Sequence, residues 1–260
     1  MLCGINKGTR LSRFLLGSSK KYVAGVKLGV QTDTLDITGV VTETFPSAVI
    51  DGISLDRIND VIEVFKGVQM QHPPVYSALK HKGKPLYKLA REGTPVRKPP
   101  RSIEIHSIEL KSLDKPYMTI YVHCSAGTYI RSLAHDIGQK LGCGALLQSL
   151  RRVETSNFSV DAAVSLEKFE CMEQEDAFKC IIPMTEAISH MPTINADPEM
   201  MTQLKFGRPF RPADDFSSDD EICRHELTYF KVVDSDGNLA AIVEYDREID
   251  SYNYSCVFVN

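Results

Sequence analysis

The segment that most constrains the fold is one in which a strand pattern runs directly into a helix pattern. Residues 117–124 (YMTIYVHC) alternate between apolar and polar side chains, as half-buried strands do. After the small-residue turn SAGT, apolar side chains recur at helical spacing, so a helix is predicted to begin near Thr128. A strand, a tight turn and a helix in this order expose backbone N–H groups at the edge of a sheet, where ligands commonly bind. The residues that give the helical spacing are Ile130, Leu133, Ala134, Ile137 and Leu141.

Arg131 falls in the first turn of this predicted helix. The helix macrodipole is positive there and favours acidic side chains by a few tenths of a kcal/mol to about 1 kcal/mol. An arginine at this position is therefore expected to meet a negatively charged group. The sequence leaves open whether that group is a nearby surface carboxylate or part of a functional site. A P-loop is excluded, because the pattern G-x-x-x-x-G-K-[ST] is absent.

Further helices and strands are predicted along the chain, which indicates a mixed α+β architecture. Alternation predicts a strand at 22–30, and short helices are expected at 9–17 and 84–93. A serine N-cap and a terminal glycine delimit a helix at 54–67. Its predicted apolar face consists of Leu55, Ile58, Ile62 and Phe65.

After residue 160 the periodic signals weaken. One helix is expected around 164–176. Two apolar runs joined by Asp-Gly within 229–245 predict a β-hairpin. We therefore expect a largely antiparallel sheet flanked by helices, followed by a small β-rich C-terminal domain.

The charge distribution divides the chain into a basic and an acidic part. The net charge is −4, but residues 1–160 carry 22 Lys and Arg against 13 Asp and Glu, whereas residues 161–260 carry 8 against 21. This shift predicts one domain made of residues 1–160 and a second made of residues 161–260. The most basic stretch, 80–101, has eight Lys and Arg and one Glu. It indicates either a surface for nucleic-acid phosphates, which the interleaved Tyr87 favours, or a solvated helix face and loop.

The remaining composition is that of an ordinary soluble globular protein, with 43% hydrophobic and 25% charged residues. No apolar run is long enough to span a bilayer, and the first residues lack the apolar core of a signal peptide. Seven cysteines without a CxxC pair predict reduced thiols and a cytoplasmic protein. The cysteines and histidines have no ligand spacing, so no metal is expected.

A second group of polar residues lies between residues 20 and 39. Tyr22 opens the predicted strand directly behind Lys20 and Lys21, and the loop TDTLD contains Asp33 and Asp36. The two aspartates are suited to acid–base work or to metal binding. Equally, Asp, Thr and Gly at this density commonly form turns. Neither group defines a reaction class by itself.

Taken together, three stretches resemble a known family in order and spacing. They are KGTRLSRFLLGSSKKYVAGVKLGVQTDTLDITG, PPVYSALKHKGKPLYKLAREG and CSAGTYIRSLAHDIGQKLGCGALLQSLRR, and they cover roughly residues 4–160. This part of the chain resembles the TruB family of tRNA pseudouridine synthases. The segments FGRPF and DSDGNLAAIVEYD resemble, more loosely, the PUA-like RNA-binding domain of bacterial members.

The resemblance implies isomerisation of a uridine in the T-loop of tRNA to pseudouridine, without metal or organic cofactor. It implies that Arg131 pairs with the carboxylate of a catalytic aspartate and that Tyr22 stacks on the uracil after the nucleotide is flipped out of its stack. Tyr129 and Leu150 are then expected to enclose the base, and Asp36 corresponds to a polar residue of the active site.

The same resemblance implies a monomeric protein whose partner is the T-arm stem-loop of tRNA. Aromatic and cationic side chains in the matching stretches are expected to contact the RNA. Besides Tyr129 and Leu150, these predicted RNA-binding residues are Lys20, Lys21, Tyr76, Lys80, Lys82, Lys84, Arg151 and Arg152.

The sequence departs from the family pattern in one respect. The family carries its nucleophilic aspartate in a G-x-L-D-P-x-A-x-G-like loop upstream of the stretch that matches residues 2–14, whereas the first aspartate here is Asp33. We therefore expect the 260-residue chain to be a truncated and inactive form. The alternatives are an RNA-binding or RNA-folding module that grips the T-arm without catalysis, and a nucleotide-binding enzyme that uses the SAGTYIR junction for phosphate.

Overall fold

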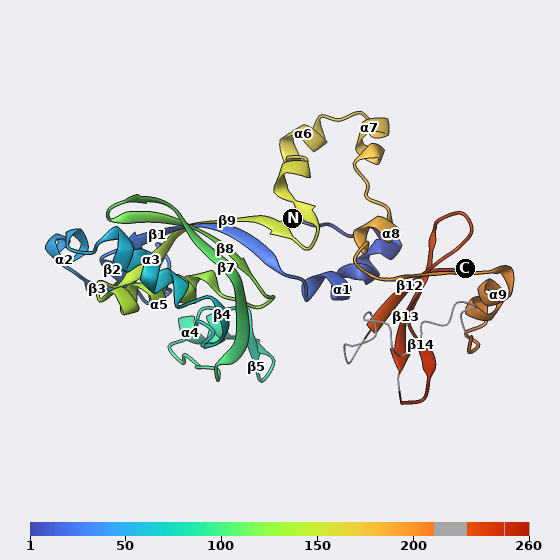
Figure 1. The fold of residues 1–260 in the computed structure, drawn as a ribbon, viewed down its shortest axis with the longest axis horizontal. Helices are drawn as coiled ribbons and strands as arrows, with labels where there is room; N and C mark the ends of the chain where they lie inside the picture. Colours follow the sequence, from blue (N-terminus) through green and yellow to red (C-terminus); the bar gives the residue numbers. More distant parts are fainter. Residues whose placement is uncertain (211–227, 247, 260) are drawn as a thin grey trace. The chain divides into compact units, whose positions relative to one another are not determined.

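The computed structural model describes residues 1–210, 228–246 and 248–259. The chain forms two compact units, one made of residues 17–163 and one made of residues 1–16 with residues 164–260 (Figure 1). The division after residue 163 lies close to the predicted boundary after residue 160. Residues 1–16 group with the second unit, in contrast to the predicted division, because Leu11 is buried among residues of the C-terminal sheet.

The unit of residues 17–163 is built on a six-stranded antiparallel sheet with the order β10-β9-β1-β8-β7-β4. This arrangement, with helices packed on it, confirms the predicted α+β class. Two further hairpins pair β2 (Val30–Thr32) with β3 (Val41–Thr44) and β5 (Lys80–His81) with β6 (Lys84–Pro85). The six strands of the sheet are β1 (Lys20–Leu28), β4 (Gly67–Gln71), β7 (Arg101–Asp114), β8 (Tyr117–Cys124), β9 (Ala145–Thr155) and β10 (Phe158–Ser159).

Helices α3 (Leu55–Glu63) and α5 (Ile130–Leu141) bury their apolar side chains with one face of this sheet. On β1 the buried residues are Ala24, Val26 and Leu28, as the alternation predicted. Because successive side chains of a strand point to opposite faces, Lys21, Val23 and Lys27 lie on the face away from the helices. The shorter helical segments of this unit are α2 (Ser47–Asp51), α4 (Leu86–Arg91) and the 3-10 turn Val160–Ala162.

The start of α3 and the end of α5 follow from their sequences, whereas the end of α3 predicted at Gly67 was wrong, because the helix ends at Glu63 and Gly67 begins β4. The hydroxyl of Ser54 accepts the N–H of Arg57 at 3.2 Å, which confirms the predicted N-cap. The prediction for the apolar face of α3 was wrong at Leu55, which is the first residue of the helix and is 52% exposed, whereas the buried residues begin with Ile58. Helix α5 ends at Gly142, whose φ of 78° is left-handed. A Cβ atom at Gly138 would lie 2.2 Å from the backbone nitrogen of Ala145, so only glycine fits there.

The second unit is built on a four-stranded sheet with the order β11-β12-β13-β14. Strand β11 (Thr193–Asn195) runs parallel to β12 (Thr228–Val233), and β13 (Leu239–Asp246) is antiparallel to β12 and to β14 (Ser251–Val257). The hairpin predicted at 229–245 is therefore confirmed. Its turn is held by the carboxylate of Asp234, which accepts the N–H groups of Asp236 and Asn238.

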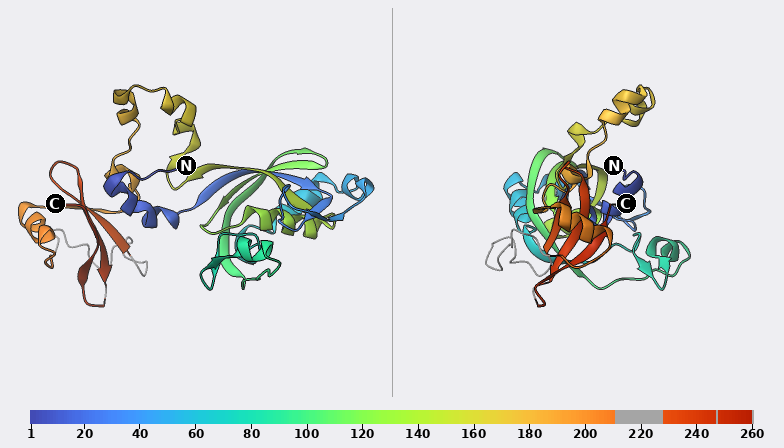
Figure 2. Two further views of the ribbon diagram at one scale, coloured as in Figure 1. Left: turned by 180° about the vertical axis from the view of Figure 1, so that it is seen from behind. Right: turned by 90° about the vertical axis from the view of Figure 1, so that its right-hand side faces the viewer.

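The second unit also contains several short helices (Figure 2). The single helix predicted around 164–176 is two helices, α6 (Leu166–Glu170) and α7 (Gln174–Lys179), because the chain turns between them at residues 171–173. They are followed by α8 (Met184–Ala187) and α9 (Pro198–Lys205). None of the helices in the described ranges is long and apolar enough to cross a membrane.

The first residues of the chain belong to this second unit. A 3-10 helix (Asn6–Leu11) and α1 (Ser12–Leu16) lie along β14, and the side chains of Lys7 and Arg10 donate to the carbonyls of Phe258 and Val257 at 2.7 and 2.6 Å. Leu11 is buried in one cluster with residues of β13 and β14.

Candidate functional site

The side chain of Arg131 joins the start of α5 to two other segments of the chain. Its Nη1 atom lies 3.1 Å from a carboxylate oxygen of Asp36 and donates to the carbonyl of Thr34 at 3.3 Å. Its Nη2 atom donates to the carbonyl of Tyr76 at 2.7 Å. A guanidinium has five N–H donors. The bonds that the described residues supply therefore leave further donors of Arg131 for another acceptor.

Asp36 is held in one orientation by two threonines of its own loop. One carboxylate oxygen accepts the hydroxyl of Thr34 at 2.8 Å and both the backbone N–H and the hydroxyl of Thr38, at 3.0 and 2.6 Å. Burial alone raises the pKa of this carboxyl, but the bonds from Thr38 and Thr34 and the positive charge of Arg131 outweigh it, so the pKa lies below its ordinary value. Asp36 is therefore ionised at neutral pH, facing a cation.

The loop of residues 33–39 is attached to β9 through its backbone. Leu147 donates to the carbonyl of Leu35 and accepts the N–H of Ile37, both at 3.0 Å. Leu35 has a φ of +64°, which lets the loop turn sharply there. A Cβ atom at Gly39 would lie 2.5 Å from the carboxylate of Asp33, so the tight loop depends on glycine. These contacts place Asp36 beside Arg131, at the N-terminal end of α5.

Asp33 binds the backbone of its own loop and the hydroxyl of Tyr76, whereas Asp36 binds Arg131. One of its oxygens accepts the N–H of Val40 at 2.8 Å, and the other accepts the hydroxyl of Tyr76 at 3.2 Å. The hydrogen bond to Asp33 raises the pKa of the Tyr76 hydroxyl. Tyr76 thus contacts the loop through its hydroxyl and Arg131 through its carbonyl. Asp33 and Asp36 do form a turn, which was one of the two interpretations of TDTLD. Asp33 also binds Tyr76, and Asp36 also binds Arg131, and both partners are predicted site residues.

Tyr22, Leu150 and Arg152 share the helix-bearing face of the sheet. Tyr22 lies opposite Arg152 in the β1–β9 ladder, and Leu150 lies opposite Ala24, which is a core residue. Leu150 is 46% exposed, so its side chain forms an open apolar surface on that face. Burial raises the pKa of the half-buried Tyr22 hydroxyl, as does Cys124, while Arg152 acts in the opposite direction.

Lys20 adds a second cation beside Arg152. Burial lowers the pKa of its ammonium group, and the positive charge of Arg152 lowers it further. Two like charges held close together are stabilised by a negatively charged ligand.

The structure does not bring every predicted site residue to this group. Arg151 lies opposite Val23, on the face away from the helices. Lys21 lies on that face as well, in an ion pair of 2.8 Å with Glu154. The physical reason in both cases is the strict alternation of the strand, which separates adjacent side chains. Lys80, Lys82 and Lys84 are exposed on the β5–β6 hairpin.

Tyr129 occupies the N-cap position of α5, two residues before Arg131. Its backbone N–H donates to the side chain of Gln71 at 2.8 Å, and its ring lies under the guanidinium of Arg101 at 4.8 Å. Gln71, Arg101, Thr34 and Thr38 were not found from the sequence. The threonines had a local signal, since Thr two residues to either side of Asp is a turn-forming pattern. The sequence carries no corresponding local signal for the other two.

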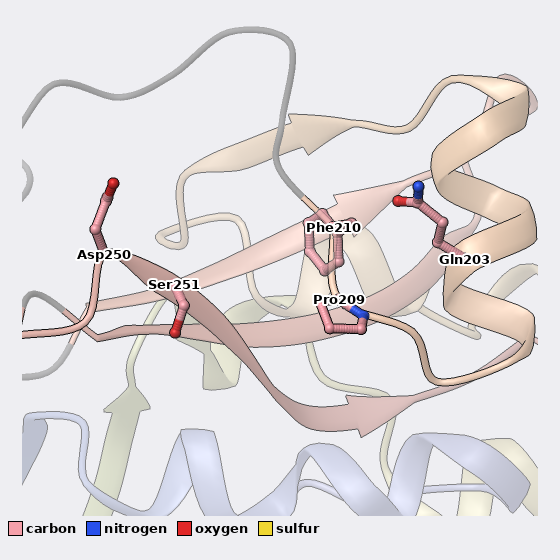
Figure 3. A pocket seen from close by; sticks show the side chains of 5 residues that line it. All are labelled: Gln203, Pro209, Phe210, Asp250 and Ser251. Carbon is pink, nitrogen blue, oxygen red and sulfur yellow. The ribbon is translucent and has the colours of Figure 1, made fainter.

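The second unit has a separate surface hollow of about 300 Å³. Figure 3 shows Gln203 on α9, Pro209 and Phe210 after it, and Asp250 and Ser251 at the start of β14. The ring of Phe210 stacks on Tyr252 with 5.7 Å between centroids. None of these five lining residues is basic and Asp250 is acidic, so they offer no positive charge to a phosphate.

Comparison with protein-family models gives two matches. Residues 1–130 match the N-terminal domain of the TruB family pseudouridylate synthases. Residues 131–189 match the tRNA pseudouridylate synthase B C-terminal domain. The junction between the two matches falls between Ile130 and Arg131.

Curated proteins named tRNA pseudouridine synthase B are similar over most of the chain. The protein from Syntrophotalea carbinolica is 42% identical over 209 residues, which is 80% of this chain and 67% of that protein. The protein from Tolumonas auensis is 36% identical over 248 residues, covering 90% of this chain and 75% of that protein.

Two solved structures share the fold. One is an H/ACA RNP bound to a substrate RNA containing 2′-deoxyuridine, with a TM-score of 0.66 and 20% identity over 98% of this chain and 71% of that chain. The other is a Cbf5-Nop10-Gar1 complex, with a TM-score of 0.65 and 22% identity over 98% of this chain and 70% of that chain.

Proposed function

Because this chain belongs to the TruB family of pseudouridylate synthases, we propose that it isomerises a uridine in the T-loop of tRNA to pseudouridine. The observation that carries the proposal is the joining of Arg131, Asp36 and Tyr76 by hydrogen bonds at the start of α5. This ionic group lies on the side of the sheet that also carries Tyr22 and Leu150.

The residues around Tyr22 suit a base that has been taken out of its stack. An extruded base needs an aromatic or apolar surface to replace the stacking that it has lost. The Tyr22 ring and the exposed side chain of Leu150 supply such surfaces. Lys20 and Arg152 stand beside them as cations for the flanking phosphates.

Arg131 is suited to orient a carboxylate near the reacting nucleotide. Its unused donors and its partial exposure allow a second acceptor besides Asp36. An arginine is preferable to a lysine in this role, because its planar donors hold a carboxylate in a defined orientation. Asp36, ionised and clamped by Thr34 and Thr38, keeps the guanidinium in place.

We assign the nucleophile to neither aspartate of the loop. Both oxygens of Asp33 and both oxygens of Asp36 already accept hydrogen bonds or an ion pair. A nucleophile has to present a free oxygen to the substrate. The family resemblance places the nucleophilic aspartate in a loop whose pattern residues 1–32 do not contain.

The test is pseudouridine formation in a T-arm stem-loop and in whole tRNA, detected by chemical labelling of the product. Two proteins are compared, the 260-residue chain and a version extended upstream by the family's aspartate loop. Product from the extended version supports the proposal, and product from the 260-residue chain also supports it while overturning the expected inactivity. Absence of product from both, with salt-dependent RNA binding retained, favours the alternative of an RNA-binding module.

T-arm specificity, a monomeric state and a cytoplasmic location are part of the proposal. The T-arm is tested by competition, with a D-arm stem-loop of equal length expected to compete poorly. The monomer is tested by sedimentation with and without RNA. The location is tested by cell fractionation, in which the protein is expected to accompany tRNA.

A further inference from the structure

Gln71 and Arg101 lie side by side at the end of the β4–β7 ladder. Their Cα atoms are paired in the antiparallel register, with Gln71 last in β4 and Arg101 first in β7. Both side chains contact the turn that leads from β8 into α5. Neither residue belongs to the group around Arg131 and Asp36 described above, yet both contact the same turn.

Gln71 binds the backbone of Tyr129 on both sides. Its Nε2 atom donates to the carbonyl of Tyr129 at 3.0 Å, and its Oε1 atom accepts the N–H of Tyr129 at 2.8 Å. Gln71 is only 4% exposed. Two hydrogen bonds from a buried side chain fix the two peptide groups that flank the Cα atom of Tyr129. Tyr129 makes no side-chain cap of its own, and Gln71 accepts the N–H of this N-cap residue, one of the first N–H groups that have no partner within the helix.

Arg101 contacts the side chain of the same residue, Tyr129. Its guanidinium carbon lies 4.8 Å from the centre of the Tyr129 ring, and its Nη2 atom donates to the carbonyl of Gly127. Within the described ranges Arg101 takes part in no ion pair, so these two contacts set its position. Gly127 has a φ of +84°, and a Cβ atom there would lie 3.1 Å from the guanidinium carbon. The close approach of Arg101 therefore depends on glycine in the SAGT turn.

The neighbouring residues extend this connection towards Arg131. The hydroxyl of Ser132 donates to the carbonyl of His72, which follows Gln71 directly. Tyr129 and Ser132 are thus both bonded to the end of β4, and Arg131 lies between them.

We propose that Gln71 and Arg101 form a clamp that positions the Tyr129 ring and the Arg131 guanidinium for the flipped nucleotide. Both are positioning residues, because they act through Tyr129 and Arg131. This inference rests on the proposed function, since it assumes that Tyr129 contacts the base and that Arg131 lies near the reacting nucleotide. The structural part, that the clamp orders the first turn of α5, is independent of it.

The first measurement compares the affinity of the 260-residue chain for two T-arm stem-loops, one with the target uridine and one abasic at that position. R101M removes the guanidinium and Q71E removes the donor to the Tyr129 carbonyl. Each is expected to weaken binding of the uridine stem-loop about tenfold and to leave binding of the abasic one unchanged, since the abasic RNA has no base to enclose. R101K is expected to lie between wild type and R101M. The control is K111M, which removes a cation 5.3 Å from the ring of Tyr121 on the same sheet.

The second measurement is hydrogen exchange of the backbone amides in residues 125–133 of the same proteins without RNA. R101M and Q71E are expected to exchange faster there, with residues 145–155 unchanged. Unchanged exchange in residues 125–133 overturns the clamp, as does an equal loss of affinity for both stem-loops. If wild type binds both stem-loops equally, the contact of Tyr129 with the base fails, and the exchange data alone then decide whether the clamp exists.

Discussion

The two sheets of this protein use their aromatic side chains in opposite ways. In the four-stranded sheet, Phe230, Tyr245 and Tyr252 are buried, and the rings of Phe230 and Tyr245 contact that of Tyr252 at 5.7 and 5.0 Å between centroids. In the six-stranded unit, Tyr22, Tyr76 and Tyr129 are only partly buried. Their neighbours there are the charged groups of Arg152, Asp33 and Arg101.

This difference separates aromatic residues that stabilise a core from aromatic residues available to a ligand. A ring whose edges and faces are all covered contributes through buried area, whereas a half-covered ring with a charged neighbour keeps one face for a further contact. The charge distribution follows the same division. Residues 1–160 are basic and residues 161–260 are acidic, so the three partly buried tyrosines lie in the part of the chain that attracts phosphate.

The largest effect is expected from emptying the aromatic core of the four-stranded sheet. F230A removes a fully buried ring and is expected to lower the free energy of unfolding of the second unit by about 3–5 kcal/mol. Hydrogen exchange of β12, β13 and β14 measures this, with the six-stranded unit as internal reference. The matched control is F206A, whose side chain is 69% exposed and whose loss is expected to cost less than about 0.5 kcal/mol. Equal effects of the two substitutions would contradict the assignment of Phe230 to the core.

The next effect is expected at the polar end of α5. In the form of the protein that shows turnover, R131K is expected to lower pseudouridine formation about 100-fold, because an ammonium group cannot keep the contacts to Asp36 and Tyr76 and still orient a second carboxylate. RNA affinity, measured by filter binding, is expected to change little. The control is R57K on α3, an exposed arginine that donates to the carbonyl of Lys140. Full activity of R131K removes the role given to Arg131.

A smaller effect is expected from neutralising the lysines of the β5–β6 hairpin. Replacing Lys80, Lys82 and Lys84 with alanine is expected to make the slope of log affinity against log salt shallower by about two to three, since each phosphate contact contributes about 0.7–0.9. The same number of lysines is removed from the acidic part in the control, which changes Lys168, Lys179 and Lys205. If the control variant loses as much slope as the first, the basic part is not the RNA surface.

The smallest effect is a contribution of Asp36 to stability whose pH dependence is confined to acid conditions. The pKa of Asp36 is lowered in the folded protein, so its contribution to stability is complete above the ordinary value of 3.8 and is lost as the pH falls through the lower folded value. Urea unfolding of wild type and D36N is expected to differ by a constant amount from pH 7 to pH 5. Below 3.8 the two free energies of unfolding should converge, because a protonated carboxyl resembles the amide. A constant difference down to the lowest pH, or one that D60N reproduces, would exclude this origin.

Elements with a local pattern were predictable, and long-range contacts were not. The strand of residues 117–124, helix α5 and the capped helix α3 follow from periodicity and from single residues such as Ser54 and Gly142. The identity of the group facing Arg131 was not accessible in this way, because Asp36 lies 95 positions away in the sequence. A resemblance suggested a different carboxylate for that position. Among the described residues, the structure supplies Asp36.

The same reasoning explains what was missed at Tyr129. The bonds from Gln71 span 58 positions, and the contact with Arg101 depends on the register of β4 with β7. The sequence near Gln71 and Arg101 contains no pattern that predicts this register. Strand β9 was also not predicted as a strand, since its apolar residues cluster at its start and its exposed cations at positions 151 and 152 break the alternation.

The attachment of residues 1–16 to the C-terminal sheet has a consequence for the order of events on the ribosome. Lys7 binds a carbonyl 251 positions further along the chain, so residues 1–16 find these partners only after the C-terminal strands have been synthesised. Every strand of the six-stranded sheet lies between residues 20 and 159, so that unit can assemble while translation continues. Residues 1–16 are then recruited last, and a chain that stops after residue 163 lacks the C-terminal sheet to which they bind.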